Sequence, residues 1–453
     1  MFVDTHAHLF YENFNEDLEK VIQRAKENQI DYIIVPATDL QTAKAAIALS
    51  EKYDFIYSAV GVHPHETKDW NKNYLDEIKD LIKHNKVVAI GEIGLDYYYD
   101  FSPKEKQIEA FKDQIELSLE INKPIIVHNR DSDKDMMEII RYYSCSGLKA
   151  QFHCFNASLN DAIELTKLNH FISFTGNITY KKSELNRKIL KTLDINHLLL
   201  ETDSPFMSPN PYRGKRNEPS YLINTVKQIS EIKNLSIEDI GKITSLNAFR
   251  IFGIGKKPAT SFTYQLGNSL YINVTNRCNA NCIFCRRETD PFISGYNLGM
   301  KKSEEPDPEV YIREIDDPKK YDEIVFCGYG EPTIRWDVVK KVAEYVKAND
   351  GKTRLNTNGH GNLINNRDIT PEMRGLIDTV SISLNSTDAK QYSELMRVDQ
   401  KFYYSMIDFA KKSVQNVERV VLSVVDLDEV EIEKARTLVE EEIKAEFRIR
   451  HYF

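Results

Sequence analysis

The chain has 453 residues, of which 41% are hydrophobic and 28% are charged, a composition typical of folded globular proteins. Its length exceeds what one hydrophobic core usually holds, so we expect two domains. The net charge of −9 argues against a broad basic surface for sequence-independent nucleic-acid binding. Since no apolar run reaches membrane-spanning length and no leader precedes the first run, we expect a cytoplasmic protein without membrane contact.

The first half alternates short apolar runs with amphipathic stretches. Apolar side chains recur at three- and four-residue spacing, as in helices, over residues 16–28, 104–122, 133–143, 220–233 and 237–251. The apolar runs are eight, at residues 2–6, 32–37, 56–62, 87–93, 124–128, 150–155, 171–176 and 197–203. Eight strands alternating with helices predict a TIM-like (β/α)8 barrel over residues 1–253.

A change of composition then divides the chain. Residues 254–265 are rich in Gly, Lys, Pro and Ser, and we interpret them as a linker. Apolar runs resume at residues 269–274, 323–327, 353–357, 379–384, 419–425 and 446–451, with helical stretches such as 336–348 and 429–442 between them. This pattern predicts a second α/β domain over residues 266–453, a smaller and partial (β/α)6 barrel.

Histidines and carboxylates of the first half gather at the ends of the predicted strands, where barrels of this class place their active sites. His6 and His8 are two residues apart on one strand, so both imidazoles point to the same side. Glu92 ends the fourth strand between two glycines, Gly91 and Gly94, which permit close approach of a ligand. The residues predicted to bind metal are His6, His8, Glu92, His128, His153 and Asp203.

Imidazole nitrogens with carboxylate oxygens suit zinc, manganese or iron, and magnesium where oxygens dominate, so we expect two divalent ions, Mg, Mn or Zn. Two such ions roughly 4 Å apart can position a nucleophile and stabilise the leaving oxygen of a displaced phosphate. Glu92 is the expected bridge between them, and Asp203 could also take the proton from the attacking water, so both are predicted catalytic residues. Any one of these histidines alone would be an ordinary core or surface residue.

The motifs around these residues resemble those of the TatD family of metal-dependent hydrolases, in the same order over residues 1–253. They are Asp4-Thr5-His6-Ala7-His8-Leu9, Gly61-Val62-His63-Pro64-His65, Gly91-Glu92-Ile93-Gly94-Leu95-Asp96-Tyr97, His128-Asn129-Arg130-Asp131, His153-Cys154-Phe155 and Glu201-Thr202-Asp203-Ser204-Pro205. The stretch from Pro211 to Pro219 resembles that family too.

The resemblance implies exonuclease activity on DNA, and so a DNA or other nucleic-acid or nucleotide substrate. It also implies metal contact by the same six residues. Cations at strand ends suit a polyanion, so the substrate-binding candidates are His63, His65, Arg130, Arg213 and Arg216. For each of these, a solvated charge or a structural salt bridge is the alternative. Asn156-Ala157 departs from the Ser/Thr-Gly pair common in the family.

Three cysteines fall within eight residues directly after a predicted strand. Cys278, Cys282 and Cys285 are spaced to hold three irons of a 4Fe–4S cluster, which leaves the fourth iron open for the amino and carboxylate groups of S-adenosylmethionine (SAM). The alternative is a zinc site, which usually needs a fourth protein ligand. Cys327 is far in sequence, although the fold could bring it near.

The second half resembles the radical SAM superfamily, over about residues 266–453. The resemblance rests on the cysteine triplet with Phe284, on Gly328-Tyr329-Gly330-Glu331-Pro332-Thr333, on Thr357-Asn358-Gly359, and on the alternating polar residues of one strand. It implies that a reductant reduces the cluster and that SAM is cleaved to a 5′-deoxyadenosyl radical. The residues expected to contact SAM are Phe284, Gly328, Gly330, Glu331, Ser381, Ser383 and Asn385.

The whole sequence therefore predicts a bifunctional enzyme. The first domain would be a hydrolase, a 3′–5′ exodeoxyribonuclease, and the second a radical enzyme acting on an unknown substrate. The alternatives are a hydrolase of amide or ester bonds, and a second domain that only carries a cluster or zinc as a binding module.

Overall fold

The computed structural model describes residues 2–287, 289–426 and 430–451. The contacts divide the chain into two compact units, residues 1–257 and 258–453, which we call the first and the second unit and describe separately. Among the described residues, no helix is both long and apolar enough to cross a membrane.

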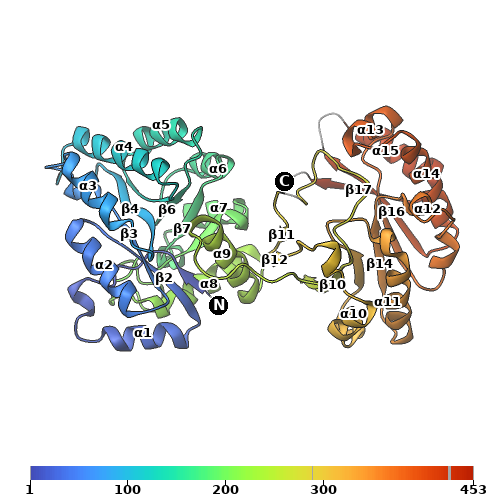
Figure 1. Ribbon diagram of the computed structural model, residues 1–453, viewed down its shortest axis with the longest axis horizontal. Coiled ribbons are helices and arrows are strands. Elements are labelled where there is room, and N and C mark those ends of the chain that lie inside the picture. Colours follow the sequence, from blue (N-terminus) through green and yellow to red (C-terminus); the bar gives the residue numbers. More distant parts are fainter. Residues whose placement is uncertain (1, 288, 427–429, 452–453) are drawn as a thin grey trace. The chain divides into compact units, whose positions relative to one another are not determined.

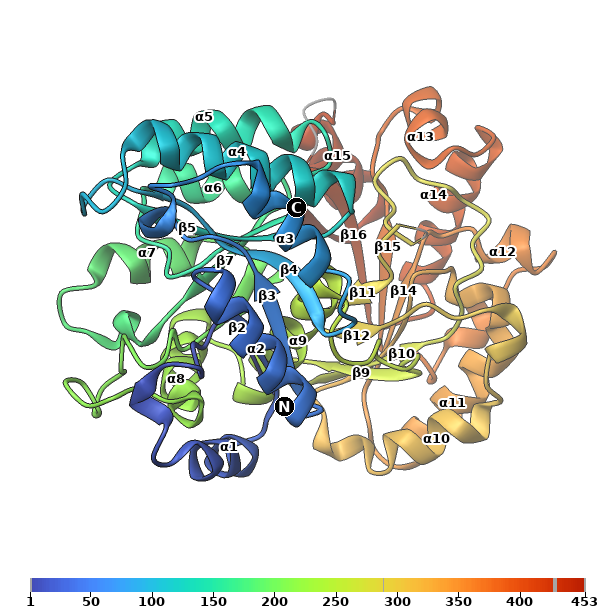
Figure 2. The same ribbon diagram turned by 60° about the vertical axis from the view of Figure 1, so that its left-hand side comes forward.

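Eight parallel strands form the centre of the first unit, paired in chain order from β1 to β8 (Figures 1 and 2). They are β1 (Phe2–Asp4), β2 (Ile30–Pro36), β3 (Ile56–Val60), β4 (Val87–Asp96), β5 (Ile125–Arg130), β6 (Ala150–Phe152), β7 (Phe171–Phe174) and β8 (Leu198–Leu200). The first and last strands meet, because the Thr5 amide donates to the Leu200 carbonyl at 2.9 Å and Ala7 bridges Ser204. The predicted TIM-like barrel is confirmed.

The helices of the first unit lie outside the ring of strands (Figure 2). They are α1 (Leu18–Glu27), α2 (Leu40–Lys52), α3 (Lys72–Leu81), α4 (Lys104–Glu120), α5 (Asp133–Ser144), α6 (Leu159–Lys167), α7 (Glu184–Thr192), α8 (Leu222–Lys233) and α9 (Ile237–Phe252). In α1 the buried residues are Val21, Ile22 and Ala25, at the spacing that places side chains on one helix face.

Several strands end earlier than the sequence pattern predicts. β1 ends at Asp4 rather than residue 6, and β8 ends at Leu200 rather than residue 203. The chain leaves the ladder there; Asp203, for example, has a left-handed backbone with φ of 55°. His6 and Asp203 consequently stand on the turns that follow the strands, at the carboxyl end of the barrel.

The second unit is built on a seven-stranded sheet in the order β17-β16-β15-β14-β13-β10-β9. Six strands are parallel, as predicted: β10 (Ser269–Asn273), β13 (Ile324–Cys327), β14 (Thr353–Thr357), β15 (Thr379–Ser383), β16 (Arg419–Asp426) and β17 (Glu446–His451). The seventh, β9 (Thr263–Leu266), is antiparallel to β10 and begins inside the segment that composition marked as a linker. Its Tyr264 is buried, which a free linker residue would not be.

The helices of the second unit alternate with these strands (Figure 1). They are α10 (Pro308–Ile315), α11 (Trp336–Ala348), α12 (Gly361–Ile364), α13 (Ala389–Met396), α14 (Lys401–Val414) and α15 (Ile432–Thr437). The helix predicted at residues 429–442 begins at Ile432 and continues as a π-helical turn, Leu438–Ile443, while residue 429 lies outside the described residues. The short strands β11 (Phe292–Ile293) and β12 (Tyr296–Asn297) form a separate hairpin.

Candidate metal and cluster sites

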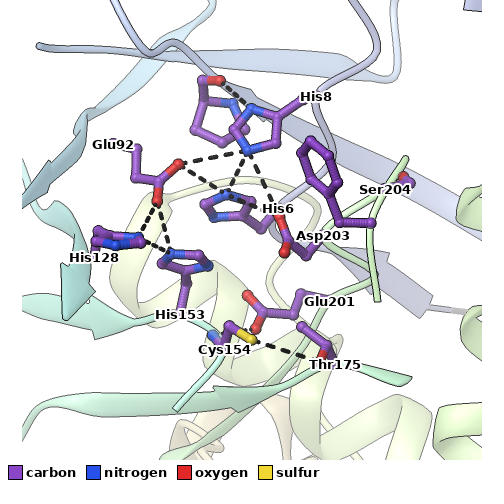
Figure 3. A network of polar contacts seen from close by, with 12 residues as sticks. His6, His8, Glu92, His128, His153, Cys154, Thr175, Glu201, Asp203 and Ser204 are labelled. Carbon is purple, nitrogen blue, oxygen red and sulfur yellow. Dashed lines mark hydrogen bonds and ion pairs between the residues drawn. The ribbon is translucent and has the colours of Figure 1, made fainter. Parts of the chain in front are cut away.

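Side chains from five strand ends converge inside the first unit (Figure 3). The Nε2 atoms of His6 and His8 are 3.1 Å apart, and the His6 ring stacks on His153 with 4.0 Å between centroids. His128 Nδ1 lies 3.3 Å from His153 Nε2. The structure thereby brings together all six residues predicted as metal ligands: His6, His8, Glu92, His128, His153 and Asp203.

Glu92 lies at the centre of this cluster, and its two oxygens face different imidazoles (Figure 3). Oε2 is 3.4 Å from His6 Nε2 and 3.5 Å from His8 Nε2. Oε1 is 2.9 Å from His128 Nδ1 and 2.7 Å from His153 Nε2. One carboxylate therefore touches two groups of nitrogen donors.

Asp203 completes the side of the cluster formed by His6 and His8. Its Oδ1 is 3.6 Å from His8 Nε2, and its backbone amide donates to the His6 carbonyl at 2.8 Å. A buried carboxylate holds the two turns together: Asp4 accepts hydrogen bonds from the Thr202 amide at 2.9 Å and from the Thr202 hydroxyl at 2.6 Å. The position of Asp203 relative to His6 thus depends on Asp4.

The pKa values of the two catalytic candidates depart from their ordinary values in opposite directions, although burial acts to raise both. Burial acts to raise the pKa of Glu92, but the imidazoles of His153, His63 and His6 overcome it and hold that pKa well below its ordinary value. Burial raises the pKa of Asp203 to about 8, although His153 opposes the shift. Removing carboxylates from water is costly, and a cation between them would offset that cost.

The hydrogen bonds on the outer side of the cluster determine which imidazole nitrogens face inward. His8 Nδ1 lies 3.0 Å from the Pro36 carbonyl, which can only accept, so Nδ1 carries the proton and the Nε2 lone pair faces the cluster. His128 Nε2 likewise lies 3.0 Å from Asp96 Oδ2, which leaves the Nδ1 lone pair facing Glu92. Lone pairs that converge on carboxylates fit divalent metal ions.

Two further buried carboxylates, neither of them among the six predicted ligands, belong to the site. Asp96 binds His128 and is 1% exposed. Glu201 is fully buried, accepts from the Cys154 amide at 2.5 Å and the Ser173 hydroxyl at 2.8 Å, and has an oxygen near ligand atoms of His6 and His153. Glu201 directly follows β8, which ends at Leu200, so its place at the same strand end as Asp203 is the signal that indicates it.

Of the residues predicted to contact substrate, three lie beside the cluster. His63 Nε2 is 3.5 Å from Glu92 Oε1, and His65 Nε2 is 2.9 Å from Asp96 Oδ2. Arg130 ends β5, and its guanidinium lies over the Tyr98 ring.

The other two predicted substrate contacts have different neighbours. The guanidinium of Arg213 lies 4.4 Å from the centroid of the Tyr180 ring. Arg216 pairs with Asp17 at 2.7 and 2.8 Å, and with Glu218 at 3.6 Å. Two carboxylates thus hold Arg216 in a structural ion pair, and neither arginine's contacts involve one of the six metal ligands.

The cysteine triplet lies on the loop after β10 in the second unit, and all six cysteines of the chain are free thiols. Burial raises the pKa of Cys278 and raises that of Cys282 to about 12, and the neighbouring Cys278 and Cys285 thiols add to the rise at Cys282. The loop is fixed to the end of α13, because the amide of Asn281 donates to the Met396 carbonyl at 3.1 Å. The loop that carries the three thiols is therefore anchored to the end of α13.

Nearby residues that could serve as a fourth ligand are already bonded. His360 Nδ1 lies 2.9 Å from Nδ2 of the Asn279 side chain, and its Nε2 lies 2.7 Å from the Tyr392 hydroxyl. The side-chain amide of Asn356 donates to Cys327 Sγ at 3.5 Å. Three cysteines on one loop, with His360 and Cys327 already bonded elsewhere, fit a cluster with one open iron better than a four-ligand zinc site.

The glycine-rich turn after β13 packs directly on the cysteine loop. A Cβ atom at Gly330 would lie 2.3 Å from the carbonyl oxygens of Thr275 and Arg277, so only glycine fits there. The Glu331 carboxylate, predicted to contact SAM, accepts hydrogen bonds from protein groups, among them the Thr357 hydroxyl and the Asn358 backbone amide, both at 2.7 Å. Its role in this structure is to hold the turn against the end of β14.

The polar residues predicted to contact SAM continue along the end of β15. Ser383 Oγ and Asn385 Oδ1 both accept from Arg450 Nη2, at 3.3 and 3.1 Å, and Ser381 precedes them on the same strand. Phe284 is partly buried against the core of the second unit, and Gly328 has a positive φ of 114°. Arg450, from the last strand, is a member of this group that the sequence pattern did not indicate.

A barrel with this donor set defines the first unit as a metal-dependent hydrolase. The chain belongs to the TatD related DNase family, whose family model matches residues 3–253. The model of the Radical SAM superfamily matches residues 272–448, so the second unit is a radical SAM domain. The cofactors expected from the two families are divalent metal ions, a 4Fe–4S cluster and SAM.

Relatives and solved structures of the first unit agree with this family. The metal-dependent hydrolase YabD of Bacillus subtilis, described as uncharacterized, is 45% identical over 254 residues, which are 56% of this chain and all of YabD. The 3′-5′ ssDNA/RNA exonuclease TatD of Pectobacterium parmentieri is 32% identical over 55% of this chain and 98% of its own. The crystal structure of the Escherichia coli TatD homologue YJJV matches with a TM-score of 0.54 and 29% identity over 56% of this chain and 98% of that one.

Proposed function

We propose that the first unit is a divalent-metal-dependent nuclease that removes nucleotides from the 3′ end of DNA. The observation that carries this proposal is Glu92, whose two oxygens face two groups of imidazoles as a carboxylate between two metal ions does. A relative that is named a 3′-5′ exonuclease supports a nucleic-acid substrate.

Each residue of the cluster has a role in this proposal. His6, His8 and Asp203 would hold one ion, His128 and His153 the other, and Glu92 both. Two ions, when bound, supply positive charge for the attacking and leaving oxygens of a phosphodiester. Asp203 accepts the proton of the attacking water, while Asp4 and Asp96 keep the surrounding turns and rings in place.

The test is nucleotide release from a 5′-labelled single-stranded oligodeoxynucleotide after metal removal with EDTA and addition of Mn²⁺ or Mg²⁺. We expect stepwise shortening from the 3′ end, lost in Glu92→Gln and retained in Asp100→Asn, since Asp100 is an exposed carboxylate of the β4–α4 segment. Metal-dependent cleavage of an amide or ester without nucleotide release would favour the alternative hydrolase.

We further propose that Cys278, Cys282 and Cys285 hold a 4Fe–4S cluster with SAM as the ligand of its open iron. With an external reductant, the bound pair supplies a 5′-deoxyadenosyl radical to a substrate not yet identified. Glu331 keeps the glycine turn beside the cysteine loop, and Arg450 orders Ser383 and Asn385 at the end of β15.

Anaerobic reconstitution with iron and sulfide, reduction, and addition of SAM tests the second unit. We expect 5′-deoxyadenosine from the wild type and none from Cys282→Ala. If protein with a full iron–sulfur complement forms no 5′-deoxyadenosine, the second unit is a binding module rather than an enzyme.

A further inference from the structure

A group of exposed aromatic side chains lies at the carboxyl end of the barrel, in the segment between β4 and α4. Tyr98 is 57% exposed, Tyr99 41% and Phe101 59%. Burial of such rings is strongly favourable, and a contiguous exposed group indicates a recognition surface. Together with Arg130 at the end of β5, we call these residues the aromatic shelf.

The rings of the shelf are ordered relative to one another. Tyr99 and Phe101 stack with centroids 5.2 Å apart and planes 26° apart. The guanidinium of Arg130 lies 3.9 Å from the Tyr98 centroid and 4.9 Å from the Tyr99 centroid. In the described part of the chain, no carboxylate lies within ion-pair distance of Arg130, so its charge is open to an anion.

Hydrogen bonds connect the shelf to the metal site through Asp96. The amides of Tyr98 and Tyr99 donate to Asp96 Oδ1 at 3.0 and 3.1 Å. The other oxygen of Asp96 lies 3.0 Å from His128 Nε2. His65, which also bonds to Asp96, packs against Phe101 in an edge-to-face arrangement with 4.8 Å between the ring centroids. The shelf is thus fixed beside the imidazoles of the cluster.

We propose that the aromatic shelf binds a nucleobase next to the phosphodiester that is cleaved, with Arg130 on a neighbouring phosphate. The proposal rests on the proposed nuclease function and names the subsite that holds the substrate strand. Flat rings stack on bases whatever their sequence, and a guanidinium binds phosphate through parallel N–H groups. A base can reach such rings only when it is unpaired, so the shelf selects single strands or frayed ends.

Binding of two fluorescein-labelled decamers tests the shelf, with Ca²⁺ in place of the catalytic ion. One is oligothymidylate, and the other has the same backbone with a tetrahydrofuran in place of each base. We expect the wild type to bind oligothymidylate about 5- to 150-fold more tightly, because stacking of one base contributes about 1–3 kcal/mol. In Tyr98→Ala/Phe101→Ala this preference should fall toward one.

Control variants separate stacking from general damage. Tyr142, 74% exposed on α5, is a matched tyrosine outside the shelf, so Tyr142→Ala should keep the preference. Phe101→Trp should keep it as well, whereas Arg130→Gln should weaken both decamers alike, since phosphate contacts carry no base information.

Equal affinity of the wild type for the two decamers, or a preference that survives the double substitution, would overturn the shelf. Cleavage of the same oligothymidylate in Mn²⁺ reports on the nuclease function independently. If the wild type binds bases through the shelf but releases no nucleotide, the proposed nuclease function is wrong while the proposed base-binding subsite is supported.

Discussion

Asp96 determines the orientation of two imidazoles at once, because its Oδ2 lies 2.9 Å from His65 Nε2 and 3.0 Å from His128 Nε2. In Asp96→Asn the amide replaces a full negative charge, and one ring loses its acceptor. We expect metal affinity about 10- to 100-fold weaker, the usual effect of removing a carboxylate behind a metal-binding histidine. Titration calorimetry with Mn²⁺ measures the change.

The matched control for this variant is Asp100→Asn, an exposed carboxylate four residues further on. Its Mn²⁺ affinity should equal that of the wild type. If Asp96→Asn also binds Mn²⁺ as the wild type does, then Asp96 does not position His128 for metal binding.

His170 provides a pH-dependent contribution to the stability of the first unit. Burial, with a smaller effect of His197, lowers its pKa from 6.5 to about 4, and its Nε2 pairs with the Ser144 hydroxyl at 2.8 Å. The unfolded chain therefore takes up this proton near pH 6.5, and the folded chain only near pH 4. Stability must fall as the pH decreases through that window, by up to about 3 kcal/mol for this group.

His170→Gln should flatten that pH dependence between about 6.5 and 4. Urea unfolding followed by Trp70 fluorescence, in a Trp336→Phe background, confines the readout to the first unit. An unchanged slope in His170→Gln would show that this histidine is protonated alike in both states.

At the residue scale, contacts between side chains that are distant along the chain could not be predicted from the sequence. The histidines of the candidate metal site were predictable because each belongs to or follows an apolar run, a local pattern. Arg216 was predicted as a phosphate contact with a structural salt bridge as the alternative, and its partner Asp17, 199 residues away, reaches it only in the folded barrel. Asp96 was part of a motif, yet its role follows from His65 and His128, both more than 30 residues earlier or later.

At the scale of elements, apolar runs located the strands well and their ends poorly. A buried turn is as apolar as the strand before it, so the predicted eighth strand ran to residue 203 although β8 ends at Leu200. The four-residue strand β9 was not predicted, because the sequence around it is rich in Gly, Lys and Pro. Only its pairing with β10 makes it a strand.

The turn after β13 gives an element-scale prediction. In Gly330→Ala the new methyl group would lie 2.3 Å from the carbonyl oxygens of Thr275 and Arg277, so the turn or the cysteine loop must move. We expect iron incorporation after reconstitution to fall severalfold, measured as iron per chain. Gly375→Ala is the control, because Gly375 has a positive φ but open space around it.

Normal iron incorporation in Gly330→Ala would mean that the two loops adjust without cost to the cluster. A loss in Gly375→Ala as well would point to general destabilisation, since replacing a left-handed glycine costs about 1 kcal/mol even without a clash.

At the scale of the whole molecule, the proposed metal ligands and the proposed cluster ligands belong to different units. Residues of the metal site lie between His6 and Asp203, all in the first unit, and those of the cluster site lie between Cys278 and Arg450, all in the second. Each chemistry should therefore be separable by substitution within the intact chain.

A crossed pair of variants tests this separation. Asp203→Asn removes the proton acceptor and one metal ligand, so nucleotide release should fall by at least about 100-fold while 5′-deoxyadenosine formation stays at the wild-type level. Cys282→Ala should do the reverse, because without three thiolates the cluster cannot assemble. Circular dichroism establishes that both variants are folded. If either substitution abolished both activities in a folded chain, the two sites would depend on one another, and a shared substrate or a product passed between them would become the simplest explanation.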